Sequence, residues 1–340
     1  MMISKPQRYT LANLKRVYEN PELIEKEVSY LSQSTKQLLH GSIEKKLFES
    51  KYGSGIEVTE RDWDNLIILD ACRYDVFESV NWLDGTLEKV VSQASHSSEF
   101  IDANFNGKQL HDSVYISANP HADKTLQDGV FHQVIKTYNQ SGADLETPEL
   151  EYECLHPEYI YKTATNHISD FPDKRLIIHF MTPHAPYFGD KADRLRDKLR
   201  KKNIGFYSQK HMQNIDNSEK VFSDLLGAAQ QGYISDSDLY DCYVDNVEFV
   251  LRYVSRLIKN VEGKTIITGD HGELLGDPST LFSPKYKHPS NGYTPELRNV
   301  PWLEINSDER KHIVSEEPKP AKKTSTETVE EQLRALGYTD

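Results

Sequence analysis

Residues 265–273 read TIITGDHGE, and this stretch decides more of the fold than any other. Its first part, Thr265–Thr268, is a short run of apolar and β-branched residues, which is typical of a strand covered on both faces. Gly269 permits a tight turn at the end of that strand. Asp270 and His271 follow at once, and they offer a carboxylate oxygen and an imidazole nitrogen to one metal ion. The stretch therefore predicts a buried strand that ends in two metal-ligand side chains.

The same arrangement recurs earlier in the chain. Leu66–Leu69 is a continuous apolar run followed directly by Asp70, and Leu176–Met181 is another. Leu87–Val91 and Val114–Ser117 are weaker strand candidates. Runs of this kind with helical segments between them predict an α/β fold, with a mostly parallel central sheet and helices on both faces.

One helix is predicted clearly, from about Asp238 to Lys259. Its apolar residues recur at intervals of three and four, which places them on one face: Leu239, Tyr243, Val247, Val250, Leu251, Val254 and Ile258. Ligands of open parallel sheets bind beyond the carboxyl ends of the strands. We therefore expect the functional site at the carboxyl ends of the predicted strands, where Asp70, His184 and Asp270 lie.

Length and charge bound the organisation of the chain. Its 340 residues suffice for one large α/β domain with appendages. We expect a helical N-terminal arm over residues 1–60 and a catalytic domain over 61–312, with an insert at about 189–236. A flexible linker and a short C-terminal helix are expected over 313–340. The net charge of −13 excludes a general nucleic-acid binder, which needs a basic surface.

Several features bear on location. The three cysteines are few and widely spaced, so they predict no disulfide framework. The N-terminus lacks the apolar core of a signal peptide, and no run is long enough for a membrane span. We therefore expect a cytoplasmic protein without an integral membrane segment. The basic stretch Lys191–Lys202 is read as a solvated helix face, while peripheral membrane contact stays open.

The segment SHSSEF, residues 95–100, supplies candidate nucleophiles. A hydroxyl at the start of a helix gains the helix dipole and free backbone N–H groups, which suit a phosphoryl oxygen. A bound metal lowers the pKa of such a hydroxyl. A plain helix cap is the alternative for each serine. Spacing alone does not rank Ser95, Ser97 and Ser98.

Two histidines complete the predicted site. His184 lies after the run Leu176–Met181 and His288 follows the Asp-His pair, and both lie beside prolines. Either histidine can contact a non-bridging oxygen, hold a second metal or protonate a leaving group. His179, within the run, is expected to be mainly structural. Arg73 is expected to pair with Asp75 or to face the substrate.

Taken together, these motifs resemble the alkaline-phosphatase-like superfamily, and in particular its sulfatase-like and lipoteichoic-acid-synthase or phosphoethanolamine-transferase-like branches. The resemblance runs from about Trp63 to Ile305, and TGDHGELLGD is its most specific part. It implies metal ligation by Asp70, Asp270 and His271. It aligns Ser95 with the nucleophile of these enzymes, which also contacts the metal, and it matches His184 and His288 to substrate-binding histidines.

Departures from the family pattern narrow the expected reaction. Sulfatases need Cys/Ser-x-Pro-x-Arg for formylglycine, but this chain has Ser97 in place of the Pro and Glu99 in place of the Arg. We therefore expect a metal-dependent hydrolase or transferase that acts on phosphate esters. A sulfate-ester hydrolase and a metal-free, inactive binding module are the alternatives. The ligand set predicts one or two divalent ions, with Zn or Mn preferred and Mg or Ca tolerated.

Overall fold

A computed structural model describes residues 42–137, 155–206, 220–277 and 285–319. The chain divides into two compact units, residues 1–51 and 52–340. In the first unit, the described part is helical from residue 42 onward. Residues 1–41 of the expected helical N-terminal arm lie outside the described residues, as does the short helix expected near the C-terminus.

The second unit is built on a seven-stranded sheet in the order β2-β11-β8-β1-β5-β3-β4. Every neighbouring pair is parallel except the two pairs that β11 makes with β2 and β8. The predicted α/β fold with a mostly parallel sheet is thereby confirmed. The strands are β1 Asn65–Leu69, β2 Thr86–Val91, β3 Leu110–Ser117, β4 Phe131–Lys136, β5 Arg175–Phe180, β8 Thr265–Gly269 and β11 Asn299–Ile305.

The five strand candidates correspond to β1, β2, β3, β5 and β8, and the sequence analysis missed β4 and β11. β11 contains Pro301, which pairs with Lys89 of β2. Proline inside an apolar run argues against an interior strand because it cannot donate to the ladder. β4, with the sequence FHQVIK, alternates too weakly to stand out.

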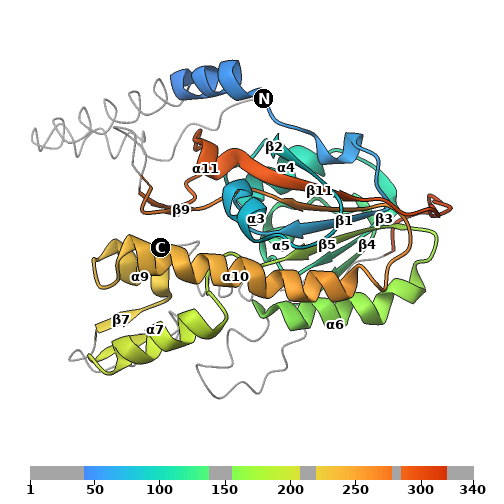
Figure 1. The fold of residues 1–340 in the computed structure, drawn as a ribbon. Helices are drawn as coiled ribbons and strands as arrows, with labels where there is room; N and C mark the ends of the chain where they lie inside the picture. Colours follow the sequence, from blue (N-terminus) through green and yellow to red (C-terminus); the bar gives the residue numbers. More distant parts are fainter. Residues whose placement is uncertain (1–41, 138–154, 207–219, 278–284, 320–340) are drawn as a thin grey trace, which may run out of the picture. The chain divides into compact units, whose positions relative to one another are not determined.

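Helices lie on both sides of the sheet (Figure 1), and alternate residues of β1 belong to two different apolar clusters. Ile67 and Leu69 of β1 pack in one apolar cluster with α3 (Tyr74–Val80), α6 (Pro157–His167) and α10 (Asp236–Leu257). Leu66 and Ile68 pack in a second cluster with residues of α4 (Ser97–Asn104) and α5 (His121–Thr125). The sheet is therefore covered on both faces, as the continuous apolar runs predict.

The long helix α10 fixes the base of the site. Its N-cap is Ser235, whose side chain accepts a hydrogen bond from the Asp238 backbone N–H. Its Tyr243 hydroxyl donates to Ala71 O at 2.6 Å and accepts from Arg73 N at 2.9 Å. The helix thus holds the turn that follows β1.

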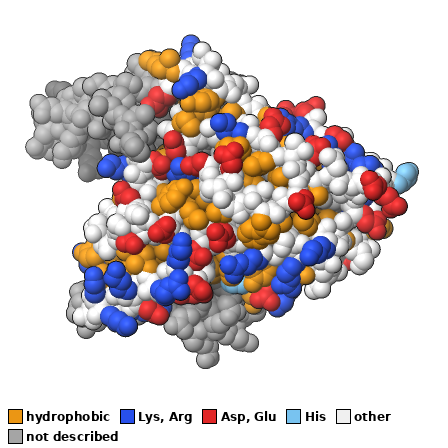
Figure 2. All heavy atoms as spheres, in the orientation of Figure 1, with side chains coloured by type: hydrophobic (Ala, Val, Ile, Leu, Met, Phe, Trp, Pro, Cys, Tyr) orange, Lys and Arg blue, Asp and Glu red, His pale blue; other side chains and the backbone are white. Residues whose placement is uncertain are grey.

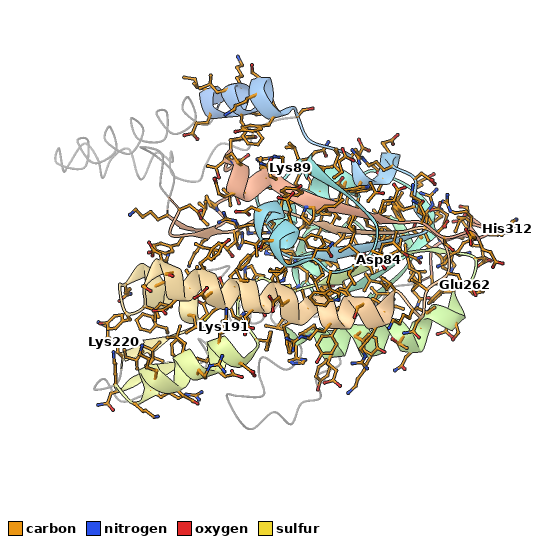
Figure 3. The ribbon with its side chains drawn as sticks, in the orientation of Figure 1. Asp84, Lys89, Lys191, Lys220, Glu262 and His312 are labelled. Atoms are coloured by element: carbon orange, nitrogen blue, oxygen red, sulfur yellow. The ribbon has the colours of Figure 1, made fainter. Side chains whose placement is uncertain are left out.

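The predicted insert is a small layer of its own, formed by α7 (Asp190–Arg200), β6 (Ile204–Phe206), β7 (Lys220–Phe222) and α9 (Leu225–Gln230). Lys and Arg side chains gather over α7 and β7 (Figure 2). In Figure 3, Lys191 and Lys220 of the insert lie at one end of the second unit. Asp84 and Glu262, which precede β2 and β8, lie at the other end. The insert therefore lies toward the carboxyl ends of the strands.

The described residues of this unit also include the short elements η2 (Val58–Glu60), η4 (Ile168–Asp170), the antiparallel pair β9 (Leu274–Leu275) and β10 (Tyr286–Lys287), and α11 (Pro295–Arg298). A flexible linker is expected from residue 313 onward. Its described part forms backbone hydrogen bonds with the rest of the second unit. Val314 N donates to Asp173 O at 2.9 Å and Lys319 N to His132 O at 2.7 Å.

Candidate active site

Parallel pairing brings the two predicted aspartates together. Leu69 of β1 is in register with Gly269 of β8, so Asp70 and Asp270 leave the sheet side by side. Both side chains are fully buried. Ala71 then takes a left-handed conformation, with φ of 58°, and its backbone N–H donates to Asp270 Oδ1 at 3.0 Å. A non-glycine residue in this region carries strain, which is common at functional sites.

Asp70, Asp270 and His271 form a first cluster, in which one ligand atom from each residue lies within 4.8 Å of the others. His271 Nδ1 lies 2.8 Å from Gly272 O. A carbonyl oxygen only accepts, so Nδ1 carries the proton and Nε2 presents its lone pair to the cluster. The three metal ligands predicted from the sequence therefore meet in one place.

The serine that meets this cluster is Ser97. Its Oγ lies 3.0 Å from Asp70 Oδ2 and 3.2 Å from His271 Nε2. Asn119, which the sequence analysis missed, donates from Nδ2 to the same Asp70 oxygen at 2.6 Å. Ser97 is the first residue of α4, so its hydroxyl lies at the helix N-terminus.

His179 lies beside the first cluster, although a mainly structural role is expected for it from the sequence. Its Nε2 lies 3.6 Å from Asp270 Oδ2 and 3.8 Å from Asp70 Oδ2, and its Nδ1 lies 2.7 Å from the Tyr115 hydroxyl. It precedes the end of β5, yet strand alternation puts it on the same face as Ile177, toward α4. Counting the period of two along β5 would have revealed it.

The first cluster has the chemistry of a divalent-cation site. Three fully buried atoms in it or beside it have no hydrogen-bond partner among the described residues: Asp70 Oδ1, Asp270 Oδ2 and His179 Nε2. Burial and the charge of Asp270 raise the pKa of Asp70 well above its usual range. Burial alone would also raise the pKa of Asp270, but His271 and His179 outweigh it and hold that pKa low. A cation would satisfy both carboxylates at once.

His184, Glu273 and His288 form a second cluster with the same spacing. The two Nε2 atoms lie 3.0 Å apart, and His184 Nδ1 lies 2.6 Å from Ala185 O. Because Ala185 O only accepts, the proton of the neutral His184 ring is on Nδ1, and Nε2 presents a lone pair. Asn246 of α10 holds the loop, because its Nδ2 donates to Pro183 O at 2.8 Å.

Glu273, the last residue of the stretch TIITGDHGE, belongs to this second cluster. It is fully buried, and neither carboxylate oxygen has a hydrogen-bond partner among the described residues. Burial raises the pKa of Glu273 well above its usual range, and burial lowers the pKa of His184 to about 4. A neutral imidazole beside a carboxylate that lacks a partner is a set suited to a second cation.

Two further histidines, which the sequence analysis missed, line the same space. The ring centroid of His96 lies 4.8 Å from that of His121, 5.2 Å from that of His288 and 6.2 Å from that of His271. Burial lowers the pKa of His96 to about 3 and that of His121 to about 2. Isolated histidines in polar loops carried no periodic signal that could have marked them.

Two predicted residues do not join either cluster. Ser95 Oγ lies 2.9 Å from Pro289 O and 2.9 Å from Gly292 N instead. Arg73 pairs with Asp75 at 2.7 Å, which is one of its two predicted roles, and with Asp277 at 2.9 Å. Its guanidinium is therefore engaged by two carboxylates, and the position of Ser95 leaves Ser97 as the serine beside the metal ligands.

No family model and no curated protein matches the chain. Among solved structures, it is similar to the integral membrane lipooligosaccharide phosphoethanolamine transferase EptA from Neisseria meningitidis, with a TM-score of 0.45 and 13% identity over 72% of this chain. That match covers 47% of the transferase. The zinc complex of the periplasmic domain of EptC from Escherichia coli gives 0.44 and 13%, covering 75% of this chain and 76% of that one. A 2-O GAG sulfatase gives 0.43 and 12%, covering 72% and 64%.

The expected cytoplasmic location is wrong by this comparison, because similar structures include periplasmic domains of EptC from Escherichia coli and Campylobacter jejuni. Within the described residues, no helix has the length and apolar character to cross a membrane. The solved structures similar to this chain thus include phosphoethanolamine transferases, a sulfatase and a protein described as belonging to the alkaline phosphatase superfamily, which are the groups that the sequence motifs resemble.

Proposed function

We propose that this chain is a metal-dependent hydrolase or transferase of phosphate esters, with Ser97 as its nucleophile. The position of Ser97 Oγ carries the proposal. It lies 3.0 Å from Asp70 and 3.2 Å from His271, and those two residues form the first cluster with Asp270. A hydroxyl among cation ligands at a helix N-terminus has the surroundings that a phosphoryl-transfer nucleophile needs.

The residues fit one or two divalent cations. Asp70, Asp270 and His271 would hold the first, with His179 beside them, and the second cluster would hold another. A bound cation would lower the pKa of the serine hydroxyl and draw charge from the phosphoryl oxygens. Mixed oxygen and imidazole ligands favour Zn or Mn over Mg or Ca.

The chain's own groups account for the proton of the nucleophile. Ser97 Oγ donates its hydrogen bond to Asp70 Oδ2, because a carboxylate oxygen only accepts. As the bond from Ser97 Oγ to phosphorus forms and the ester oxygen leaves, the serine proton passes to Asp70. The leaving oxygen takes a proton from solvent. Water or an acceptor hydroxyl then breaks the phosphoserine bond, and Ser97 regains its proton.

His96 supplies a donor for the transferred group. Its Nδ1 accepts from Ser98 N at 3.1 Å, which is the capping bond of α4. The neutral ring therefore carries its proton on Nε2. We assign this N–H to the non-bridging oxygens of the phosphoryl group.

The variant Ser97→Ala tests the assignment against Ser95→Ala. With an aryl phosphate and the best cation, Ser97→Ala should lower kcat by at least about 10³-fold, as removal of a nucleophile does. Cation content should not change, because the other ligands stay. Ser95→Ala should keep measurable turnover. The opposite ranking of the two variants would identify Ser95 as the nucleophile.

The sulfate-ester alternative uses the same ligands, so substrates separate it. Parallel assays with aryl phosphate, phosphodiester and aryl sulfate should show turnover of a phosphate ester, whereas turnover of aryl sulfate alone would favour the alternative. The metal-free binding module is tested by titrating Mn and Zn against thermal stability. No shift with either ion would favour that module.

A further inference from the structure

Ser95 is fully buried, yet it lies outside both clusters. Its hydroxyl accepts a hydrogen bond from Gly292 N at 2.9 Å and contacts Pro289 O at 2.9 Å. Gly292 N also donates to Pro289 O at 3.2 Å, so residues 289–292 form a tight turn. The hydroxyl of Ser95 therefore bridges the two ends of this turn.

Glu99, in the first turn of α4, forms a hydrogen bond with the middle of residues 289–292. Its Oε1 accepts from Asn291 N at 2.6 Å, and its Oε2 accepts from Ser95 N at 3.0 Å. Hydrogen bonds to a carboxylate are stronger than those between neutral groups. Arg298 of α11 holds the far side, donating from Nε to Gly292 O at 2.6 Å. The turn is thus fastened between α4 and α11.

The turn depends on these partners for its conformation. Asn291 takes a left-handed conformation with φ of 58°. A Cβ at Gly292 would lie 2.5 Å from the Leu297 side chain, so close packing fixes the turn on that side. A strained, closely packed turn keeps its conformation only while its surroundings specify it.

His288 immediately precedes this turn and reaches the second cluster, where its Nε2 lies 3.0 Å from His184 Nε2. We propose that Ser95 and Glu99 are positioning residues that lock residues 289–292 onto α4 and so place His288 for binding a cation. We call the hydrogen bonds of Ser95 and Glu99 to residues 289–292 the clamp. The clamp is a property of the fold, whereas its role in placing His288 rests on the proposed function. On this proposal Ser95, which the family resemblance aligns with the nucleophile, has a structural role, and Ser97 is the nucleophile.

Hydrogen exchange of the Asn291 amide measures the clamp without any assay of activity, because Glu99 is the hydrogen-bond acceptor found for that amide. In Glu99→Ala this amide should exchange at least about tenfold faster than in the wild type, since the lost bond is charge-assisted. Glu99→Gln should be intermediate. Ser95→Ala should accelerate exchange at Gly292. Asp102→Ala, an exposed carboxylate variant on the same helix, is the matched control and should change neither amide.

Cation titration connects the clamp to the second cluster. Glu99→Ala and Ser95→Ala should weaken binding of a second Zn or Mn ion by at least about tenfold while the first ion binds as in the wild type. Ser95→Thr, which keeps the hydroxyl, should restore it. Unchanged exchange at residues 291 and 292 in both variants would overturn the clamp. Faster exchange with unchanged second-ion affinity would overturn the positioning role. Faster exchange in a protein whose wild type binds no cation would refute the proposed function and leave the clamp standing.

Discussion

Replacing Asp70 with asparagine should stabilise the cation-free protein and destabilise the cation-loaded protein, both relative to the wild type. Asp70 Oδ1 and Asp270 Oδ2 are buried without hydrogen-bond partners among the described residues. An amide at position 70 keeps an oxygen to accept from Asn119 and Ser97, and it is neutral without taking up the proton that burial forces on Asp70. The same change removes a ligand from the first cluster.

The size of both effects follows from the burial of these groups. Keeping a buried carboxyl protonated costs about 1.4 kcal/mol for each pH unit above its usual pKa, until the raised pKa is reached, so the cation-free variant should gain at least about 1 kcal/mol in free energy of unfolding at neutral pH. For a domain of this size, each kcal/mol is worth roughly 2–4 °C in Tm. With a cation at about 100 times its Kd, the wild type gains about 2.7 kcal/mol that the variant should lack.

The pH dependence gives the sign of the effect. Because the pKa of Asp70 is raised in the folded protein, the folded wild type holds a proton that the unfolded chain has lost. Cation-free stability therefore falls as pH rises above the usual carboxylate pKa of about 3.9. The advantage of Asp70→Asn in chelator should be small near pH 5 and larger near pH 8.

Urea denaturation of the wild type and of Asp70→Asn measures these differences in stability. Each protein is unfolded in chelator and in excess Mn or Zn, at both pH values. Either of two results would refute the reasoning: a variant less stable than wild type in chelator at pH 8, or an equal gain from the cation in the two proteins. The first would mean that Asp70 is satisfied without a cation. The second would mean that the cation binds elsewhere.

Three further outcomes follow from the same geometry. His179→Ala should weaken cation binding by about 10- to 100-fold in titration calorimetry, because its Nε2 faces both carboxylates; unchanged affinity would return it to a packing role. Cation binding should release the protons held by Asp70 and Glu273, so apparent affinity should rise with pH by up to about tenfold per unit for each proton, and calorimetry in buffers of different ionisation enthalpy should count them. Asn246→Ala should lower the affinity for the second ion more than for the first, since Asn246 holds the loop before His184; equal losses at both ions would contradict this.

The fold could be predicted largely because parallel strands covered on both faces are apolar throughout. β1, β5 and β8 each combine such a run with the carboxyl-end position where ligands gather. β11 escaped because Pro301 interrupts an otherwise apolar strand, and its antiparallel direction leaves no trace in local sequence.

Some residues of the candidate site could likewise be predicted from local sequence, and others could not. Asp70, Asp270 and His271 lie at the ends of predicted strands, so local sequence was enough to place them. Asn119 and Ser97 join the cluster through loops whose path depends on the packing of α4 and α5, which no periodicity encodes. The choice between Ser95 and Ser97 was likewise beyond the sequence, because residues two apart at a helix start face different neighbours.

Elemental analysis of the purified protein tests the central claim most directly. The account predicts one or two equivalents of a divalent transition metal in the wild type and in Ser97→Ala, and loss of the first ion in an Asp270→Ala/His271→Ala double variant. No bound metal in any of these proteins, even after reconstitution with Zn or Mn, would contradict a metal-dependent serine mechanism at this site.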